Sequence, residues 1–240
     1  SHWHFKIRDF ASIVLQQSAL TLALLYAMPL AGSSYRGNAN IRAWAQAGLR
    51  FWARRQHRDG SFDEYYPYEH GYIPTSFSLY AAAEACRVLE WTDDAVVAAC
   101  ARAAHYLAGT AERQALNQES AAIPGLYATY LLTGEARIKA AAEDKLVRLC
   151  QLQSCEGWFA EYGGADIGYL STTLDFLAEY WRMSDDERAY EACEKIVDFA
   201  RYFVHQDGSA GGQYGSRNTE YFLLSGLSAM ADRSAAAAAM

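Results

Sequence analysis

The turn sequences RRQHRDGSF (residues 54–62), LQSCEGWF (152–159) and HQDGSAGG (205–212) decide the fold class of this chain. Each follows a helix-like segment and joins a Gln to an acidic residue, a Gly and a small or aromatic residue. With Gly109 included, the glycines at positions 60, 109, 157 and 208 recur in steps of 49, 48 and 51 residues. A steady period of about fifty residues is typical of stacked supersecondary units.

Each repeat unit is predicted to contain two helices joined by a glycine-containing loop. The first helices are expected at residues 40–56, 94–108, 137–153 and 188–205, with basic residues near their ends and a Gly at the cap beyond. The second helices are expected at residues 74–90, 119–133, 166–182 and 218–231. Pro74 fits a first helical turn, and Asp166 and Asn218 are predicted N-caps.

Strand patterns are nearly absent, so the sequence predicts an all-α fold. Residues 8–29 are expected to form the second helix of a preceding unit. The result is an incomplete (α/α) toroid or arc of about 4.5 stacked hairpins, predicted as a single domain over residues 1–240 with a low-complexity tail at 234–240. Because that number of hairpins does not close a ring of six, the chain is expected to be an arc, a fragment or one part of a longer protein.

Composition and charge exclude several classes of function. The formal net charge of −7, from 21 basic and 28 acidic residues, argues against a nucleic-acid partner. Polar side chains interrupt the apolar segment at residues 10–30, which favours a buried helix, so no membrane insertion is expected. The six His lack metal-ligand spacing, and neither a metal nor another cofactor is expected.

The five cysteines form no C-x-x-C motif and indicate buried free thiols. Free thiols favour a cytoplasmic location, and a periplasmic one stays open if a signal sequence has been removed.

Stacked hairpins would place the long glycine loops at one end and the short turns at the other. The long loops contain DEYYPYEHGY, AERQALNQES, AEYGGAD and SAGGQYGSR. A chain with 17 Tyr has more phenols than a core needs, which is typical of a cleft that binds sugars. One rim is expected to gather these side chains: Asp63, Glu64, Tyr65, Tyr66, Glu69, His70, Trp158, Tyr162, Asp166, Tyr214, Arg217, Asn218 and Glu220.

Two kinds of group on this rim suit cleavage of a glycosidic bond beside a uronic acid. A base must remove the proton next to the carboxyl group, and Tyr66 and His70 are the candidates. A cation or an amide must neutralise that carboxyl group, and Arg217 and Asn218 are the candidates. The other expected substrate contacts are Tyr65, Glu69, Trp158, Tyr162, Tyr214 and Glu220.

Hydrolysis is the alternative reaction, and it would need two carboxylates flanking the scissile bond. Glu64, Asp166 and Glu220 could supply such a pair. Each candidate also has a structural interpretation: His70 as a satisfied structural histidine, and Asp166 as a helix cap.

The stretch DGSFDEYYPYEH resembles the DGSF-x-E…YH stretch in the helical toroid of heparinase II/III-like polysaccharide lyases. The stretches EYGGADIGYL and YGSRNTEYF are similar to toroid elements of such carbohydrate-active proteins, and the resemblance covers most of residues 40–231. It implies proton transfer by His70 with Tyr66 or Tyr68, and neutralisation by Asn218. Those lyases carry a β-sandwich domain after the toroid, so a further domain or a second copy is expected to complete the cleft.

A second, weaker resemblance is to the toroids of terpenoid cyclases and protein prenyltransferases, whose Q-x-x-x-G-x-W-like repeats are similar to QHRDGSF and QSCEGWF. Their chemistry needs an acidic cluster, but the Asp pairs at 93–94 and 185–186 fall in the short turns. The leading expectation is therefore a polysaccharide lyase, ahead of a glycoside hydrolase, acting on a uronate-containing or similar glycan. The alternatives are a non-catalytic glycan-binding module, a cyclase-like protein and a helical-repeat scaffold.

Overall fold

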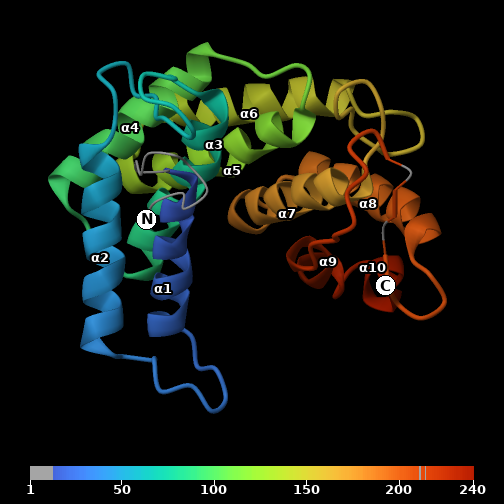
Figure 1. Cartoon of the computed structure of the whole chain (residues 1–240), viewed down its shortest axis with the longest axis horizontal. Coiled ribbons are helices and arrows are strands. Elements are labelled where there is room, and N and C mark those ends of the chain that lie inside the picture. Colours follow the sequence, from blue (N-terminus) through green and yellow to red (C-terminus); the bar gives the residue numbers. More distant parts are fainter. Residues whose placement is uncertain (1–12, 211, 214) are drawn as a thin grey trace. The chain divides into compact units, whose positions relative to one another are not determined.

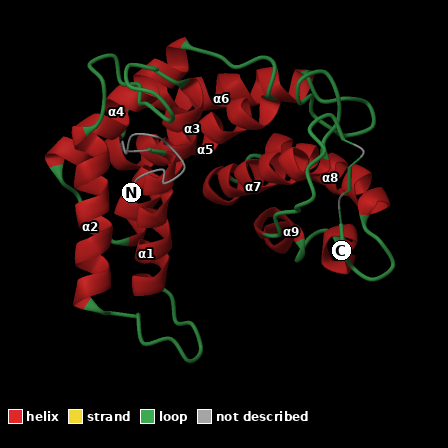
Figure 2. Cartoon of the chain, viewed as in Figure 1, coloured by secondary structure: helices red, strands yellow, loops and turns green. Residues whose placement is uncertain are grey.

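The computed structural model describes residues 13–240 except Gly211 and Tyr214, and this part of the chain is all-α (Figure 2). Isolated β-bridges occur there, but no strand. The predicted fold class is therefore confirmed. The helices are η1 (Val14–Gln17), α1 (Ser18–Ala27), α2 (Ala39–Arg54), α3 (Tyr72–Val88), α4 (Asp94–Gly109), α5 (Leu116–Thr133), α6 (Ala136–Gln151), α7 (Ile167–Ser184), α8 (Glu187–Ala200), η2 (Arg201–Phe203), α9 (Ser225–Met230) and α10 (Ala235–Ala239).

The chain divides into two compact units, and each is described by itself. Unit 1 comprises the described residues up to Ala111 together with Ala128–Lys139, and unit 2 comprises Glu112–Tyr127 and Ala140–Met240. In unit 1, α1 packs on α2 and α3, and α4 also packs on α2 and α3 (Figure 1). In unit 2, α7 packs on α8 and α9, and α10 also packs on α8 and α9. The single domain over residues 1–240 stays a prediction.

Acidic and amide side chains cap four of the described helices, α2, α4, α7 and α8, as the turn sequences indicate. Asp93 accepts hydrogen bonds from the N–H groups of Ala95 and Val96 at the start of α4. Asp186 caps α8, and Asp166 caps α7 as predicted. Pro74 lies in the first turn of α3, also as predicted. Because Asp93 and Asp186 are caps, both Asp pairs have a structural role.

Three turns share one backbone hydrogen-bond pattern, and we call them the glycine turns (residues 57–61, 154–158 and 205–209). In each, the first residue's N–H donates to the carbonyl of the fifth, and the Gly N–H donates to the carbonyl of the first. Gly60, Gly157 and Gly208 have φ of 94°, 103° and 81°, a region that favours glycine. Gly109 is instead the last residue of α4 and is not in that region, so its inclusion in the repeat was wrong.

A glutamine before the turn explains why the first two glycine turns lie so close to the next helix. Nε2 of Gln56 donates to the carbonyls of Gly60 (3.1 Å) and Ala99 (2.8 Å). Gln153 repeats this arrangement with Gly157 (2.9 Å) and Ala192 (2.9 Å). A Cβ on either glycine would collide with a backbone carbonyl of α4 or α8, so the pattern Gln-x-x-x-Gly is required by packing.

The helix predicted at residues 218–231 is wrong in its first half. The helix that forms there is α9, Ser225–Met230, and Asn218 has φ +52° and caps no helix. The preceding segment is irregular, because the start of α7 holds it: Asp166 accepts the N–H of Arg217 (3.0 Å), and Ser171 Oγ accepts the N–H of Leu223 (2.9 Å). These tertiary hydrogen bonds replace those that a helix would make.

The cysteines are free, and the prediction that they are buried holds for three of them. Cys86, Cys100 and Cys193 are buried, Cys150 is half-buried and Cys155 is exposed in the second glycine turn. None of the described helices combines the length and the hydropathy that crossing a membrane requires. The first part of the helix predicted at 8–29 lies outside the described residues.

Candidate functional site

The first glycine turn leads into a closed loop in unit 1, residues 62–71. Phe62 is fully buried and stacks on Trp52 with ring centroids 4.7 Å apart. Its carbonyl accepts the N–H of Gly71 (2.8 Å), and its N–H donates to Thr75 Oγ1 (3.1 Å) on α3. The loop is therefore anchored at both ends, and its polar residues lie between the two anchors.

Two carboxylates fold this loop. Asp63 accepts the N–H groups of three residues near the end of the loop, at distances of 2.8–3.3 Å. Glu69 Oε2 accepts the N–H groups of Glu64 (2.7 Å), Tyr65 (2.8 Å) and Tyr66 (3.4 Å). Burial raises the pKa of Asp63, but hydrogen bonds from His57 and the loop N–H groups outweigh it and lower the pKa below its usual value. Asp63 and Glu69 thus determine the loop's conformation.

His70 lies beside a carboxylate that fixes its tautomer. Its Nδ1 is 2.8 Å from Asp59 Oδ2 and 2.9 Å from Ser61 Oγ, while Ser61 Oγ donates to Asp59 Oδ1 (2.6 Å). Burial raises the pKa of Asp59, but the hydrogen bonds from Ser61 and His70 outweigh it and lower the pKa to about 2. Because Nδ1 faces acceptors, it carries the proton, and the lone pair is on Nε2.

The His70 ring is accessible, and its position is fixed by the backbone. The side chain is 43% exposed, and Nε2 has no hydrogen-bond partner within the described part of the chain. The residue has φ +50°, and its carbonyl accepts a hydrogen bond from the Tyr106 hydroxyl (2.8 Å). A left-handed backbone at a non-glycine residue is strained and is often found at functional sites.

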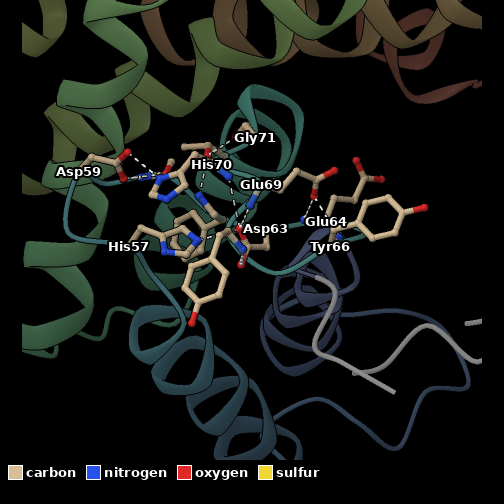
Figure 3. Close-up of polar contacts among 12 residues, drawn as sticks. His57, Asp59, Asp63, Glu64, Tyr66, Glu69, His70 and Gly71 are labelled. Atoms are coloured by element: carbon tan, nitrogen blue, oxygen red, sulfur yellow. Dashed lines mark hydrogen bonds and ion pairs between the residues drawn. The ribbon is translucent and has the colours of Figure 1, made fainter. Parts of the chain in front are cut away.

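A second imidazole stacks on the first. The rings of His57 and His70 have centroids 4.0 Å apart, and His57 Nε2 lies 2.7 Å from Asp63 Oδ1 (Figure 3). The side chain of His57 is only 18% exposed. Each imidazole therefore has its own carboxylate, but His70 is the more accessible. We call His57, Asp59, Ser61, Asp63 and His70 the His70 cluster.

Of the other residues predicted in this loop, Asp63 belongs to the His70 cluster and the Tyr68 ring centroid lies 6.4 Å from that of His57, but the rest do not converge on His70. Tyr66 is 65% exposed, and Figure 3 shows its phenol pointing away from the two imidazoles. Tyr68 is 83% exposed, and Glu64 and Tyr65 are half-buried. The partners that sequence reasoning missed, Asp59 and Ser61, flank Gly60 in the first glycine turn.

Unit 2 contains a second cluster, around Arg217. The Arg217 guanidinium carbon lies 4.6 Å from the centroid of the Tyr162 ring and 5.8 Å from that of Tyr169. Tyr169 in turn contacts Tyr221 edge-on, with ring centroids 6.1 Å apart. Tyr162 and Tyr221 are 50% and 43% exposed. A guanidinium over aromatic faces is stabilised by cation–π attraction, which orders this otherwise exposed side chain.

Asp166 anchors the segment that carries Arg217. Its side chain is 1% exposed, and its oxygens accept the N–H of Tyr169, the N–H of Arg217, and both the N–H and the hydroxyl of Thr219. Burial raises its pKa, but these hydrogen bonds outweigh it and lower the pKa below the usual value. The cap interpretation of Asp166 is confirmed, and its catalytic role stays a prediction.

Glu161 is the buried carboxyl of this cluster, and sequence reasoning missed it. It is 3% exposed, and its Oε2 accepts a hydrogen bond from Asn117 Nδ2. Burial raises its pKa to about 7, assisted by the charges of Asp166 and Glu112 and opposed by Asn117 and Arg217. We call Asn117, Glu161, Tyr162, Tyr169, Arg217 and Tyr221 the Arg217 cluster.

The remaining predicted residues lie apart from these contacts or outside the described chain. Trp158 is half-buried in the second glycine turn, and its Nε1 donates to Glu156 Oε2 (2.9 Å). Asn218 is exposed, and Glu220 accepts a hydrogen bond from Gln213 (2.8 Å). Tyr214 lies outside the described residues. Among the described residues, no group of three or more His, Cys, Asp or Glu side chains is arranged so that it could hold a metal ion.

Comparison with known proteins places the fold. No family model and no curated protein matches the sequence. The structure is similar to that of a Paenibacillus xanthan lyase, with a TM-score of 0.62 and 19% identity over 96% of this chain and 24% of that one. It is also similar to a glycosyl hydrolase family 88 protein from Bacteroides vulgatus (TM-score 0.62, 10% identity, 94% of this chain and 70% of that one).

An unsaturated glucuronyl hydrolase specific for heparin is a third similar structure, with a TM-score of 0.61 and 13% identity over 94% of this chain and 67% of that one. The chain thus spans about a quarter of the xanthan lyase and about two thirds of this hydrolase. The heparinase II/III-like resemblance is not among these structures and stays a prediction. The fold of this chain is therefore similar to part of the (α/α) toroid of carbohydrate-active lyases and hydrolases.

Proposed function

We propose that this chain belongs to a carbohydrate-active protein that cleaves a uronate-containing polysaccharide by β-elimination, with His70 as the base. The observation that carries the proposal is the contact of His70 Nδ1 with Asp59 and Ser61, which leaves the lone pair on the accessible Nε2. The likeness of the fold to a xanthan lyase supports the same reaction class.

The chemistry assigns a task to each group. His70 Nε2 takes the proton from the carbon next to the uronate carboxyl group, and Asp59 stabilises the imidazolium that forms. The electrons of the broken C–H bond form the new double bond as the glycosidic C–O bond breaks. The leaving oxygen then takes a proton from the imidazolium or from the exposed phenol of Tyr68, whose ring centroid lies 6.4 Å from that of His57.

Neutralising the uronate carboxyl group is the second requirement, because its negative charge opposes loss of the neighbouring proton. Within unit 2, Arg217 suits the binding of a uronate carboxylate, since its N–H groups form a planar fork that matches a carboxylate. Tyr162 and Tyr221 offer exposed ring faces on which a pyranose can stack.

A glycoside hydrolase is the second candidate, and the carboxyl group of Glu161 favours it. With a pKa of about 7, this group keeps its proton near neutrality, which is what a general acid of glycoside hydrolysis needs. The likeness to an unsaturated glucuronyl hydrolase supports this alternative.

One assay separates the candidates. The protein is incubated with polygalacturonate, alginate, hyaluronan and a neutral glucan, and ultraviolet absorbance of the unsaturated product is followed together with reducing ends. The variants are His70→Gln, Asp59→Asn and the control His205→Gln, because His205 is a histidine outside the His70 cluster that begins the third glycine turn. We expect absorbance and reducing ends to rise together with a uronate polymer, to fall about 10²–10⁴-fold in His70→Gln, to fall also in Asp59→Asn, and to stay unchanged in His205→Gln.

Other outcomes assign the function differently. Reducing ends without absorbance, retained in His70→Gln and lost in Glu161→Gln, would establish a hydrolase. A thermal shift with one glycan and no product would establish a binding module.

A further inference from the structure

Unit 2 places a cation and a buried carboxyl group within electrostatic reach of one another. Arg217 is exposed and rests on Tyr162 and Tyr169, while Glu161 precedes Tyr162 and is almost fully buried. We propose that Arg217 and Glu161 form a proton-coupled binding site for a uronate carboxylate, in which Glu161 gains a proton when the carboxylate binds Arg217. The proposal rests on the uronate glycan of the proposed function but does not depend on its elimination chemistry.

The guanidinium of Arg217 is held beside two tyrosine rings. Its guanidinium carbon lies over the rings of Tyr162 and Tyr169, and its N–H groups lie in the plane of the guanidinium group. The backbone is held by the hydrogen bond from Arg217 N–H to Asp166 Oδ2 (3.0 Å). Among the described residues, no carboxylate oxygen lies within ion-pair distance of this guanidinium, so its charge is available to an anion.

Glu161 is enclosed by groups that respond to such an anion. Asn117 on α5 donates to its Oε2, and the Ser216 hydroxyl donates to its main-chain carbonyl (2.6 Å). The charged groups around it are Asp166 and Glu112, which disfavour its anion, and Arg217, which favours it.

The charge balance gives the direction of the coupling. Arg217 is the one cation among the described groups that stabilise the Glu161 anion. A uronate carboxylate bound to Arg217 adds a further negative charge and neutralises that cation, so the protonated form of Glu161 becomes more favourable. Because the pKa of Glu161 in the free protein is about 7, binding takes up a proton at and above neutral pH. The ligand itself stays ionised, since free carboxyl groups lose their proton well below that range.

A sugar acid fits this surface better than a small anion does. Tyr162 is 50% exposed and Tyr221 is 43% exposed, and both belong to the same set of ring contacts as Arg217. An aromatic face binds the C–H face of a pyranose, while the guanidinium binds its carboxylate. The nearby Tyr221 hydroxyl stays protonated, because burial and the neighbouring Tyr169 raise its pKa to about 12.

Calorimetric titration tests the coupling. The probe is an oligogalacturonide, with a neutral malto-oligosaccharide as the ligand control, and the protein is the His70→Gln variant so that the probe is not cleaved. Titrations in two buffers with different ionisation enthalpies report the protons taken up on binding. With a Glu161 pKa of about 7, the affinity is expected to fall by up to about 30-fold between about pH 6 and pH 8.5, with proton uptake approaching one.

Three further substitutions in that background identify the groups. Glu161→Gln is expected to bind at about pH 8.5 as tightly as the parent does at about pH 6, without proton uptake. Arg217→Gln is expected to lose at least about tenfold in affinity at both pH values. Glu220→Gln removes an exposed carboxylate of the same segment and is expected to leave the pH dependence unchanged.

The proposal is overturned if proton uptake persists in Glu161→Gln, if Arg217→Gln binds like its parent, or if the oligogalacturonide does not bind at all. Proton-coupled binding in a protein that forms no unsaturated product would remove the proposed elimination and leave this site standing. Elimination without proton-coupled binding would support the proposed function and remove this site.

Discussion

Replacing Glu161 by Gln is expected to stabilise the protein at alkaline pH. Folding buries this carboxyl group until it is 3% exposed, and burial raises its pKa from 4.5 to about 7. Between those two values the folded state holds a proton that the unfolded state has released, so the free energy of unfolding falls as pH rises, and it levels off above about pH 7. The amide of Gln resembles the protonated carboxyl group and does not ionise.

The size of the effect follows from the pKa values. A difference of that size between the pKa of Glu161 in the folded and unfolded states corresponds to about 3 kcal/mol of free energy of unfolding. Glu161→Gln is therefore expected to match the wild type near about pH 4.5 and to exceed it by up to about 3 kcal/mol near pH 8. Urea denaturation followed by far-ultraviolet circular dichroism at several pH values measures this difference.

A neighbouring carboxylate provides a control of opposite sign. The hydrogen bonds that Asp166 accepts lower its pKa, so it contributes stability above the pKa of an unfolded Asp, and this contribution is lost as pH falls through the lower, folded value. Asp166→Asn is expected to destabilise the protein at neutral pH and to lose this effect in acid. A Glu161→Gln protein that is no more stable than the wild type near about pH 8 would refute the burial argument.

Further substitutions at two glycine turns and one buried ion pair test the packing. Gly157→Ala places a Cβ against the carbonyl of Lys195 and is expected to lower the free energy of unfolding by about 2–4 kcal/mol. Gly208→Ala meets open space and is expected to lower it by about 1 kcal/mol, from the left-handed backbone alone. Equal losses in urea denaturation would contradict the close approach at Gly157. Lys145→Met leaves Glu119, its buried partner at 2.6 Å, uncompensated and is expected to cost about 3–5 kcal/mol. The double variant Lys145→Met/Glu119→Gln should recover part of that loss, and a double variant no more stable than Lys145→Met would contradict the ion-pair explanation.

Local signals in the sequence predict most of the helices. The helices α2 to α8 lie close to their predicted ranges because apolar periodicity, caps such as Asp166 and the glycine turns are all encoded within a few residues. Gly109 shares the spacing of the turn glycines but not their surroundings, and spacing alone could not separate the two cases.

The sites depend on contacts that the sequence pattern does not contain. Glu161 is buried by Asn117, 44 residues away, and nothing in AEYGGAD distinguishes this acid from an exposed one. The segment before α9 does not become helical because Asp166, the cap of α7, and Ser171 on α7 hold its backbone. His70 was predicted, but its pairing with Asp59 requires the left-handed backbone at His70, which turns the ring toward the glycine turn.

Mass analysis of the products from a uronate polymer tests the central claim most directly. In β-elimination the two product fragments together have the mass of the substrate, and one of them is unsaturated. Hydrolysis adds one water. If His70 is the base of a β-elimination, the wild type and His205→Gln form unsaturated fragments without added water, and His70→Gln forms none. Fragments that carry the added water, or unsaturated fragments formed equally well by His70→Gln, would contradict it.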